Sequence, residues 1–480
     1  MALGSGMVSG RSGIDGRDRP TGDPMKPQQE SNTGRGWSVI WRFIWSFGLC
    51  CTVLLPKTLL AEQYNCSDES FRCVGPGQEY ASIQGAANAA QPGDTVLVFD
   101  GEYTGFQVMT SGTQTNPILF KANGSNVVIN IPGSSGDGVF LSRISHVTIE
   151  GFRIQNMTVR CISARNATPT SPMIGLTLRN NICTNAGHEG FYLSEVSKSL
   201  IEENTITGSG SDGTSKGHGI YLANAGSDDT TIRGNWISNA KTPESAGIHL
   251  NGDISVGGDG IISGVSIENN MIFNNSHHNG LNMDGVQDCT IQNNTIYGNG
   301  RSAIRAYAID GAEGPKNLRI LNNTLIVPSS ASGWSIKLTQ DGGGHLVFNN
   351  ILLTDGAGGG SLCVDNIDIT SDNNAVADRF SRDGDSLTVS LASWRSQGND
   401  TASFLATATS LFVNVLENDY HLKIGSPAID AGVGSLSGFP APGTDLSGVP
   451  RPQGSFPDIG AYESGVETVF PTPPKNLRIQ

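Results

Sequence analysis

Charged residues are scarce in this chain, making up 15% of its 480 residues, and aromatic residues make up only 7%. This shortage of charge argues against a body of long amphipathic helices, because the solvent faces of such helices are built from charged side chains. The 30 Lys and Arg residues are outnumbered by 44 Asp and Glu residues, which gives a formal net charge of −14. Nucleic acid is therefore not expected as a partner, since phosphate binding needs a concentrated basic face.

Long apolar runs are also few, and the main one covers residues 37–61, with Arg42 near its start. Its length is typical of a signal-peptide core and is short for a membrane span. The first interpretation is a signal peptide cleaved after Ala61, and the second is an uncleaved signal anchor, the one link to a membrane that we expect. Cys50 and Cys51 lack the small preceding residue of a lipoprotein cysteine, so no lipid anchor is predicted. We expect a protein that is secreted, periplasmic or on the cell surface.

Cysteine is sparse as well, with 8 residues in the whole chain. Cys66 and Cys73 lie close together just after the apolar stretch, in a chain that we expect to reach an oxidising compartment. We therefore predict a disulfide bond between them. The other cysteines are spread through the chain and are expected to behave as small buried apolar residues.

Glycine is abundant, with 62 residues, and asparagine recurs in a repeated pattern. In each repeat, alternating apolar and polar residues lead to an Asn and then to an apolar residue two positions on. Consecutive repeats are 23 to 35 residues apart. Such variable spacing excludes a strict short-repeat solenoid and is typical of a β-helix, whose coils hold short strands and one loop of free length. The repeats are LTLRNNIC (176–183), IEENTI (201–206), TIRGNWI (231–237), SIENNMI (266–272), TIQNNTI (290–296), RILNNTL (319–325) and LVFNNIL (346–352).

The alternation places residues such as Leu178 and Ile267 on the inner side of successive coils, where they are buried only by stacking. The Asn at each bend tolerates unusual backbone angles and can hydrogen-bond the Asn above and below it. We interpret these Asn residues, of which Asn294 is one, as structural rather than catalytic.

The predicted fold class is all-β, a single-stranded right-handed parallel β-helix with an N-terminal capping helix and an irregular C-terminal cap. The segment YASIQGAANAA predicts the helix, with Ile83, Ala86, Ala87 and Ala90 on the side that covers the open end of the core. The expected parts are 1–61, an N-terminal extension with the signal peptide or anchor; 62–77, a Cys-containing segment; 78–374, the β-helix; 375–463, the C-terminal cap; and 464–480, a linker-like tail.

Three stretches resemble the bacterial secreted right-handed parallel β-helix proteins of the pectate-lyase-like superfamily. They are YASIQGAANAAQPGDTVLV, the Asn-Asn repeats, and HLKIGSPAIDAG with DLSGVPRPQGSFPDIGAYE, which together cover roughly residues 78 to 463. The resemblance implies the fold and a polysaccharide as partner. It does not select one activity, because this scaffold carries lyases, hydrolases, epimerases, esterases and non-catalytic adhesins.

A second set of frames, each with a small residue before an apolar-x-apolar triplet, predicts the outward face of one sheet. The frames are GVFLS, CISAR, GFYLS, GIYLA, GIHLN, GLNMD, AIRAY and GWSIK. In register, their middle residues form what we call the middle row: Phe140, Ser163, Tyr192, Tyr221, His249, Asn282, Arg305 and Ser335. The following row, two residues later, holds Ser142, Arg165, Ser194, Ala223, Asn251, Asp284, Tyr307 and Lys337. The preceding row holds Asp137, Arg160, Glu189, His218, Ala246, Asn279, Ser302 and Ser332.

These rows predict a saccharide-binding site, because coils ~4.8 Å apart match the spacing of sugar rings along a chain. We expect Tyr192, Tyr221, Asn251, Asn282 and Lys337 to bind substrate. For β-elimination or epimerisation of a polyuronate, we assign catalytic roles to four residues. They are His249 as base, Arg305 as neutraliser of the substrate carboxylate, Tyr307 as acid, and Asp284 as a further ionisable group.

Two alternatives remain open at this point. A glycoside hydrolase would need two facing carboxylates, for which Asp284 could be joined by Asp253 or Asp310. A non-catalytic carbohydrate-binding surface protein or adhesin is the other alternative. Ca²⁺ could neutralise an anionic substrate, as in lyases of the superfamily, although no calcium-ligand motif is evident. No metal framework is predicted, since His277 and His278 would point to opposite faces, and we expect a monomer.

Overall fold

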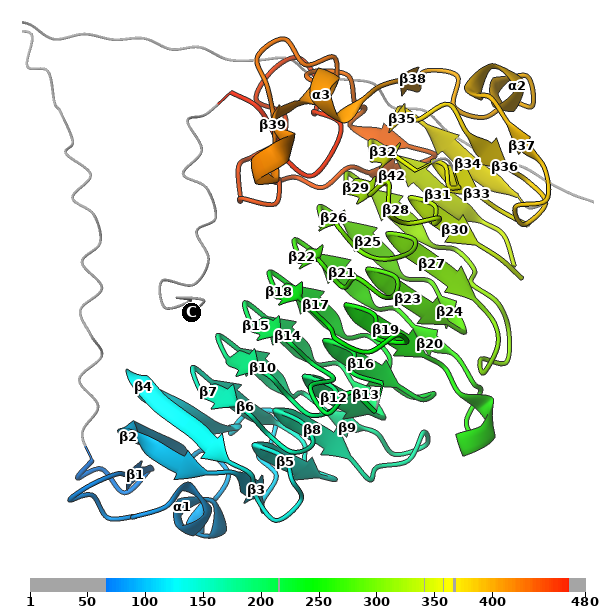
Figure 1. Ribbon diagram of the computed structural model, residues 1–480. Helices are drawn as coiled ribbons and strands as arrows, with labels where there is room; N and C mark the ends of the chain where they lie inside the picture. Colours follow the sequence, from blue (N-terminus) through cyan, green and yellow to red (C-terminus); the bar gives the residue numbers. More distant parts are fainter. Residues whose placement is uncertain (1–65, 215, 341, 357, 366–367, 466–480) are drawn as a thin grey trace, which may run out of the picture. The chain divides into compact units, whose positions relative to one another are not determined.

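The computed structural model describes residues 66–214, 216–340, 342–356, 358–365 and 368–465. The segments 1–65 and 466–480, which include the expected signal segment and most of the expected tail, lie outside the described residues. Almost every described strand is parallel to its neighbours, in stacked coils that run from the blue to the yellow end of Figure 1. The predicted right-handed parallel β-helix is confirmed.

Each complete coil contributes one strand to each of three faces. The first face consists of β6 (Val147–Glu150), β10 (Thr177–Arg179), β14 (Leu200–Glu202), β17 (Thr231–Arg233), β21 (Ser266–Glu268), β25 (Thr290–Gln292), β28 (Arg319–Leu321), β31 (His345–Phe348) and β34 (Ile369–Asp372). The second consists of β7 (Arg153–Gln155), β11 (Ile182–Thr184), β15 (Thr205–Thr207), β18 (Trp236–Ser238), β22 (Met271–Phe273), β26 (Thr295–Tyr297), β29 (Thr324–Val327), β32 (Ile351–Thr354) and β35 (Ala375–Val376).

The third face is a separate sheet. It consists of β3 (Phe106–Val108), β5 (Val139–Ser142), β8 (Ile162–Arg165), β12 (Phe191–Ser194), β16 (Ile220–Ala223), β19 (Ile248–Asn251), β23 (Leu281–Asp284), β27 (Ile304–Tyr307), β30 (Ile336–Leu338), β33 (Leu362–Cys363), β36 (Phe380–Ser381) and the antiparallel β37 (Thr388–Val389). Inward residues of the three faces form one continuous apolar core.

The bend between the first and second faces explains the paired asparagines. The first residue of a pair, such as Asn293 with φ 53°, takes the left-handed conformation that turns the chain. The second is buried and forms the predicted ladder. In Asn294 the side-chain Oδ1 accepts from the backbone N of Asn270 at 2.9 Å, and Nδ2 donates to Oδ1 of Asn323 at 3.0 Å. The same bonds link the ladder residues Asn181, Asn204, Asn235, Asn270, Asn294, Asn323, Asn350 and Asn374.

The N-terminal end of the core is closed by α1 (Ile83–Ala89), packed against β1 (Phe71–Val74), β2 (Thr95–Thr104) and β3. Ser82 is its N-cap and accepts from the backbone N of Gly85. Ile83, Ala86 and Ala87 are buried, as the sequence predicted. The predicted Cys66–Cys73 disulfide bond is also present.

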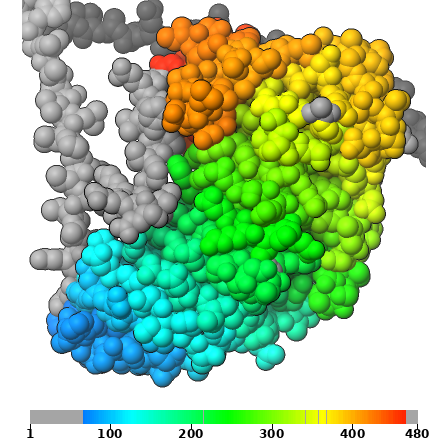
Figure 2. All heavy atoms as spheres, in the orientation of Figure 1, coloured from blue at the N-terminus to red at the C-terminus, as the bar shows by residue number. Residues whose placement is uncertain are grey.

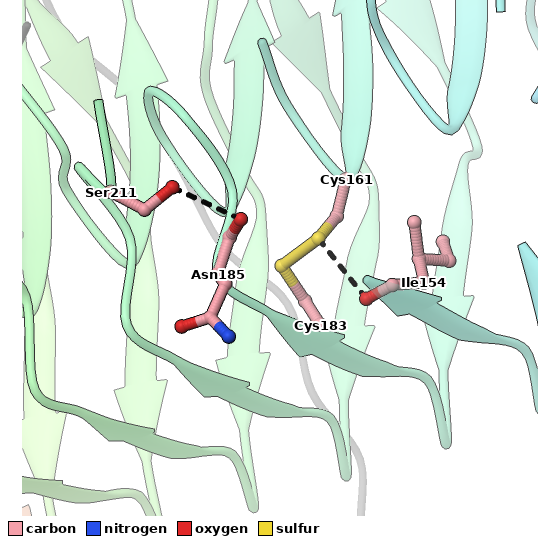
Figure 3. The surroundings of a disulfide bond; sticks show 5 residues. All are labelled: Ile154, Cys161, Cys183, Asn185 and Ser211. Carbon is pink, nitrogen blue, oxygen red and sulfur yellow. Dashed lines mark hydrogen bonds between the residues drawn. A yellow bond between two sulfur atoms is a disulfide. The ribbon is translucent and has the colours of Figure 1, made fainter. Parts of the chain in front are cut away.

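The prediction that the other cysteines are unpaired apolar residues is wrong for Cys161 and Cys183, which form a second disulfide bond across the core (Figure 3). Their frames lie on different faces, so their pairing depends on how a coil closes, which the sequence does not display. Cys289 and Cys363 are free and buried. Two disulfide bonds indicate an extracytoplasmic location.

At the other end, the core is closed by α2 (Leu391–Arg395), whose Trp394 is buried and stacks on Phe380 at 5.1 Å between ring centroids. Beyond it, α3 (Ala408–Leu411), β39 (Phe412–Asn414), β40 (Asp419–Leu422) and the chain to residue 463 fold back over the outer surface of the first two faces. This C-terminal segment is orange to red in Figures 1 and 2, against the yellow and green coils.

Left-handed asparagines of the bend hold the C-terminal segment. Asn293, Asn322 and Asn349 each donate a side-chain hydrogen bond to a backbone carbonyl, of Thr444 (2.7 Å), Asp458 (3.0 Å) and Val433 (2.8 Å) respectively. Within the segment, Arg451 and Glu463 form a fully buried ion pair at 2.8 Å. The motif GVPRPQGSFPDIGAYE thus has a structural role in this chain, because it supplies both charges of this pair.

Candidate functional site

Strand pairing on the third face places the middle row largely as predicted. Tyr192 pairs with Tyr221, Tyr221 with His249, His249 with Asn282, and Asn282 with Arg305. The next member is a correction, because Arg305 pairs with Lys337 rather than with Ser335. Lys337 therefore belongs to the middle row and not beside Tyr307. The frame GWSIK misled because Ser335 is buried and donates its hydroxyl to the carbonyl of Leu353.

Aromatic rings cover the N-terminal half of the middle row. Tyr192 and Tyr221 lie edge to face, with centroids 5.4 Å apart, and the imidazole of His249 stacks on Tyr221 at 4.9 Å. The guanidinium of Arg160 lies 4.4 Å from the centroid of the Tyr192 ring. All three rings of the row are partly exposed. His249 covers one face of Tyr221 and Arg160 covers one face of Tyr192, so the row offers a sugar the parts of the rings that remain exposed.

His249 forms a hydrogen-bonded pair with His218 of the preceding row. Nε2 of His218 lies 3.0 Å from Nδ1 of His249, while Nδ1 of His218 accepts from the backbone N of Ala246 at 3.0 Å. Because a backbone N–H can only donate, Nδ1 of His218 carries no proton, and its Nε2–H must donate to His249. Neutral His249 therefore carries its own proton on Nε2, and that N–H is buried with no partner among the described residues.

Burial governs the ionisation of this histidine cluster. It lowers the pKa of His249 to about 3, and the pKa of His218 well below its ordinary value. Burial and the nearby charges of Arg301 and Arg305 lower the pKa of His278 to about 4. At neutral pH the cluster is uncharged. The Nε2–H of His249 is then a hydrogen-bond donor with no acceptor among the described residues.

Asn279 and Asn282 orient the hydroxyl of Tyr307. Asn279 donates to Oδ1 of Asn282 at 2.8 Å, and Asn282 donates to the Tyr307 oxygen at 2.7 Å. The Tyr307 oxygen thus accepts from the protein, which leaves its O–H free to donate to a ligand. Burial raises the pKa of Tyr307, so the hydroxyl keeps its proton at neutral pH.

Arg305 differs from the other cations of these rows. Arg160, Arg165 and Lys337 form ion pairs with Glu189, Asp137 and Asp385, at 2.7, 3.2 and 3.2 Å. Within the described part of the chain, Arg305 has no carboxylate partner, and its buried Nε has no hydrogen-bond acceptor. Its guanidinium lies over the ring of Tyr307, 4.6 Å from the centroid. An uncompensated, partly buried cation is an anion-binding group.

Asp284 is committed to the backbone. Its Oδ1 accepts from the backbone N of Ile309 (2.8 Å) and Gly311 (3.0 Å), and its Oδ2 accepts from Asp310 N (3.0 Å). These bonds hold the loop after β27 in place, and Asp284 as a whole is 2% exposed. Asn251 donates to the Tyr221 oxygen at 3.2 Å and lies 3.4 Å from a carboxylate oxygen of Asp310. Asp253 caps a turn by accepting from Ser255 N.

The structure thus brings the predicted residues onto one face and adds two that sequence reasoning did not assign to the site. His218 fixes the tautomer of His249, and Asn279 orients Asn282. Both residues belong to the preceding row of the sequence prediction. The glycines on either side of His218 in GHGIYLA are the sequence signal that could have pointed to it. Asn251, Asn282, Asp284 and Tyr307 are buried, which an outward row does not predict.

Residues 100–256 match the family model NosD, described as a periplasmic copper-binding protein. No curated protein matches the chain. Solved structures that resemble it include the A-module of the mannuronan C-5 epimerase AlgE4 from Azotobacter vinelandii (18% identity, TM-score 0.41, 62% of this chain and 87% of that one). Others are pectate lyase Pel9A (14%, 0.46, 82% and 97%) and PfbA, a surface adhesin of Streptococcus pneumoniae (11%, 0.43, 62% and 84%). These likenesses concern the fold alone.

Copper, named in the description of the matched family, would need several convergent nitrogen or sulfur ligands. In the described ranges, no group of three or more His, Cys, Asp and Glu side chains could hold a metal ion. The facing nitrogens of His218 and His249 are joined to each other by a hydrogen bond. The residues present do not fit a copper ion, and we assign no step to one.

Within the same ranges, no helix is long and apolar enough to cross a bilayer.

Proposed function

We propose that this protein binds an acidic polysaccharide, a polyuronate, along the middle row from Tyr192 to Lys337. The observation that carries the proposal is the unpaired guanidinium of Arg305 beside the unpaired Nε2–H of His249 and the free hydroxyl of Tyr307. All three are donors, and they lie within two coils of one another. A uronate carboxylate would satisfy these donors, while neighbouring sugar rings stack on Tyr221 and Tyr192.

The overall charge of the chain makes the position of Arg305 significant. A net charge of −14 repels an anionic polymer from most of the surface. The other cations of the rows are neutralised by their ion pairs. Binding is therefore expected to centre on Arg305 and to weaken as salt screens its charge.

The experiment is a calorimetric titration of the purified chain with a uronate hexasaccharide at low salt. Arg305→Ala removes the cation and should weaken binding about thirtyfold, the size expected for losing a charge-assisted hydrogen bond. Arg233→Ala is the matched control, because it removes an arginine that is paired with Glu202 on the first face. Equal affinities in the wild-type chain and in Arg305→Ala would contradict the proposal.

A second candidate function is proton abstraction beside the bound carboxylate, as in a lyase or epimerase. It is favoured by the Tyr307 hydroxyl, which is oriented by Asn282 and could protonate the leaving oxygen. The tautomer selected by His218 favours His249 as a donor to the carboxylate rather than as the base. Elimination would need another group to take the proton from the sugar, so this candidate ranks below binding alone. Ultraviolet absorbance of an unsaturated uronate product, tested with and without Ca²⁺, would establish a lyase. If the ligand binds but no such absorbance appears, the protein is either an epimerase or a binding protein without catalysis. Analysis of the uronate isomers in the recovered ligand separates these two cases.

Hydrolysis receives less support from the geometry. The carboxylate of Asp284 accepts three backbone hydrogen bonds, and Asp253 caps a turn, so neither is free to act as general acid or nucleophile. New reducing ends without unsaturated product would favour hydrolysis over elimination.

A further inference from the structure

A cavity of about 400 Å³ lies on another side of the β-helix, where the second face meets the C-terminal segment. Its floor comes from Trp236 on β18, Met271 on β22 and Tyr297 on β26, and its opposite wall comes from β40 and Tyr462. The volume is within the range of small-molecule sites. None of its lining residues belongs to the rows of the third face.

The floor departs from the pattern of its own face. In the outward column that contains Tyr297, earlier coils hold Gln155, Thr184, Thr207 and Ser238, as expected on a solvated sheet. Phe273 and Tyr297 then replace these polar residues and stack parallel, with ring centroids 5.1 Å apart. Trp236 pairs with Met271 in the neighbouring outward column, and its ring lies edge-on to Phe273 at 6.0 Å.

Packing of the C-terminal segment accounts for only part of this aromatic surface. Tyr297 is 7% exposed because Tyr420 lies against it, with ring centroids 5.0 Å apart. Trp236 and Phe273 pack against the same apolar cluster and remain partly exposed. Trp236 also lines the cavity, so the exposed part of its ring is available to a ligand there.

The rim of the cavity is polar and acidic. Glu417, Asn418 and Asp419 contribute oxygen atoms, and Asp419 holds the imidazole of His421 at 2.7 Å. Among the described residues, no Lys or Arg lines the cavity. These carboxylates would repel a uronate and would accept hydrogen bonds from sugar hydroxyls.

We propose that this cavity is a second carbohydrate site, which takes a neutral saccharide by stacking a sugar ring on Trp236 and bonding its hydroxyls to the acidic rim. The pairing of an exposed aromatic face with acceptor oxygens matches the two surfaces of a neutral pyranose, its C–H face and its hydroxyl edge. The site is separate from the proposed uronate site, so either can fail alone.

Tryptophan fluorescence tests the proposal in the full chain. Trp334 and Trp394 are 1% and 0% exposed, whereas Trp236 is half-buried. Of these three tryptophans, Trp236 is therefore the one whose fluorescence emission should change when a ligand binds. The chain is titrated with neutral gluco-, xylo- and manno-hexasaccharides and, in parallel, with a uronate hexasaccharide. We expect at least one neutral sugar to shift the emission and to protect against quenching by acrylamide, and the uronate to do neither.

Trp236→Ala should weaken neutral-sugar binding, measured by calorimetry, at least tenfold. Phe456→Ala is the matched control, because it removes an exposed aromatic ring of the C-terminal segment that does not line the cavity. If Trp236→Ala does not fold, acrylamide protection in the unaltered chain still decides the matter. Three results would overturn the proposal. They are that no neutral sugar protects Trp236 from acrylamide, that folded Trp236→Ala binds the sugar as tightly as the unaltered chain, or that only the uronate protects.

Discussion

The bend that carries the asparagine ladder and the middle row of the third face both run along the same coils, but they use polar side chains in opposite ways. Each inner ladder amide donates and accepts within the ladder, as Asn294 does, so no polar capacity is left for a ligand. The middle row changes residue at almost every coil and leaves unpaired donors on His249 and Arg305. The difference indicates that the repeat supplies stability, while departures from the repeat supply the candidate chemistry.

The largest expected effect comes from breaking the ladder. Asn294→Ala would remove the acceptor of the Asn270 backbone N, one of the two acceptors of Asn270 Nδ2, and a donor to the carbonyl of Ile267, all in a buried site. At roughly 1–3 kcal/mol for each orphaned group, we expect unfolding free energy to fall by about 4 kcal/mol. Guanidinium denaturation measures the loss. Asn116→Ala, at an exposed position, should change stability by less than about 0.5 kcal/mol, and similar losses in the two variants would contradict a special role for the ladder.

The second disulfide bond links the two regions, since Cys183 lies on β11 beside the ladder and Cys161 precedes β8 on the third face. It closes a loop with a sequence separation of 22 residues. Replacing both residues with Ala should lower the unfolding free energy by about 3 kcal/mol, mainly by freeing the unfolded chain. Cys289→Ala, which removes a buried free thiol, is the control. Loss of stability only in the control would show that this cross-link has no role.

The pH dependence of stability sharpens the comparison, because the ladder does not titrate and the histidine cluster does. Burial lowers the pKa of His249 to about 3 from its ordinary value of 6.5, so the unfolded chain binds the proton first as pH falls. This contribution to stability is complete above pH 6.5 and declines below it, down to the folded-state pKa. Between pH 7 and 5.5, the wild-type chain should lose about 1 kcal/mol more than His249→Gln. Identical losses, measured by denaturant midpoints, would show that His249 is not held neutral by the fold.

The smallest expected effect is on a single ligand contact. Tyr307→Phe removes the hydroxyl that Asn282 orients and keeps the ring beneath Arg305. Affinity for the uronate hexasaccharide should fall about threefold to tenfold. The unfolding free energy should also fall, by roughly 1–3 kcal/mol, because the buried Nδ2 of Asn282 loses its acceptor. Tyr80→Phe, at the N-terminal end of the chain, should leave affinity unaltered. A Tyr307→Phe chain that binds as tightly as wild type would remove Tyr307 from the ligand contacts.

The sequence predicted what depends on repetition. The repeats, the bend asparagines and the capping helix were evident because alternation and turn chemistry are local properties. The roles of the paired asparagines were not separable, since one residue turns the chain and the other forms the ladder. The register of Lys337 was missed because Trp334 occupies a buried position that shifted the apparent frame.

Features that depend on loop conformation could not be predicted. The sequence predicted a catalytic role for Asp284, but its carboxylate accepts hydrogen bonds from three backbone N–H groups of the loop after β27. The tautomer of His249 depends on a bond between Ala246 and His218 in the adjacent coil. The pairing of Cys161 with Cys183 likewise requires the closed coil.

The most direct test of the account is a crystal structure of the chain soaked with a uronate oligosaccharide. The account predicts a carboxylate within hydrogen-bond distance of both the Arg305 guanidinium and Nε2 of His249, with a neighbouring sugar ring over Tyr221. A ligand bound elsewhere, with Arg305 left unoccupied, would contradict it.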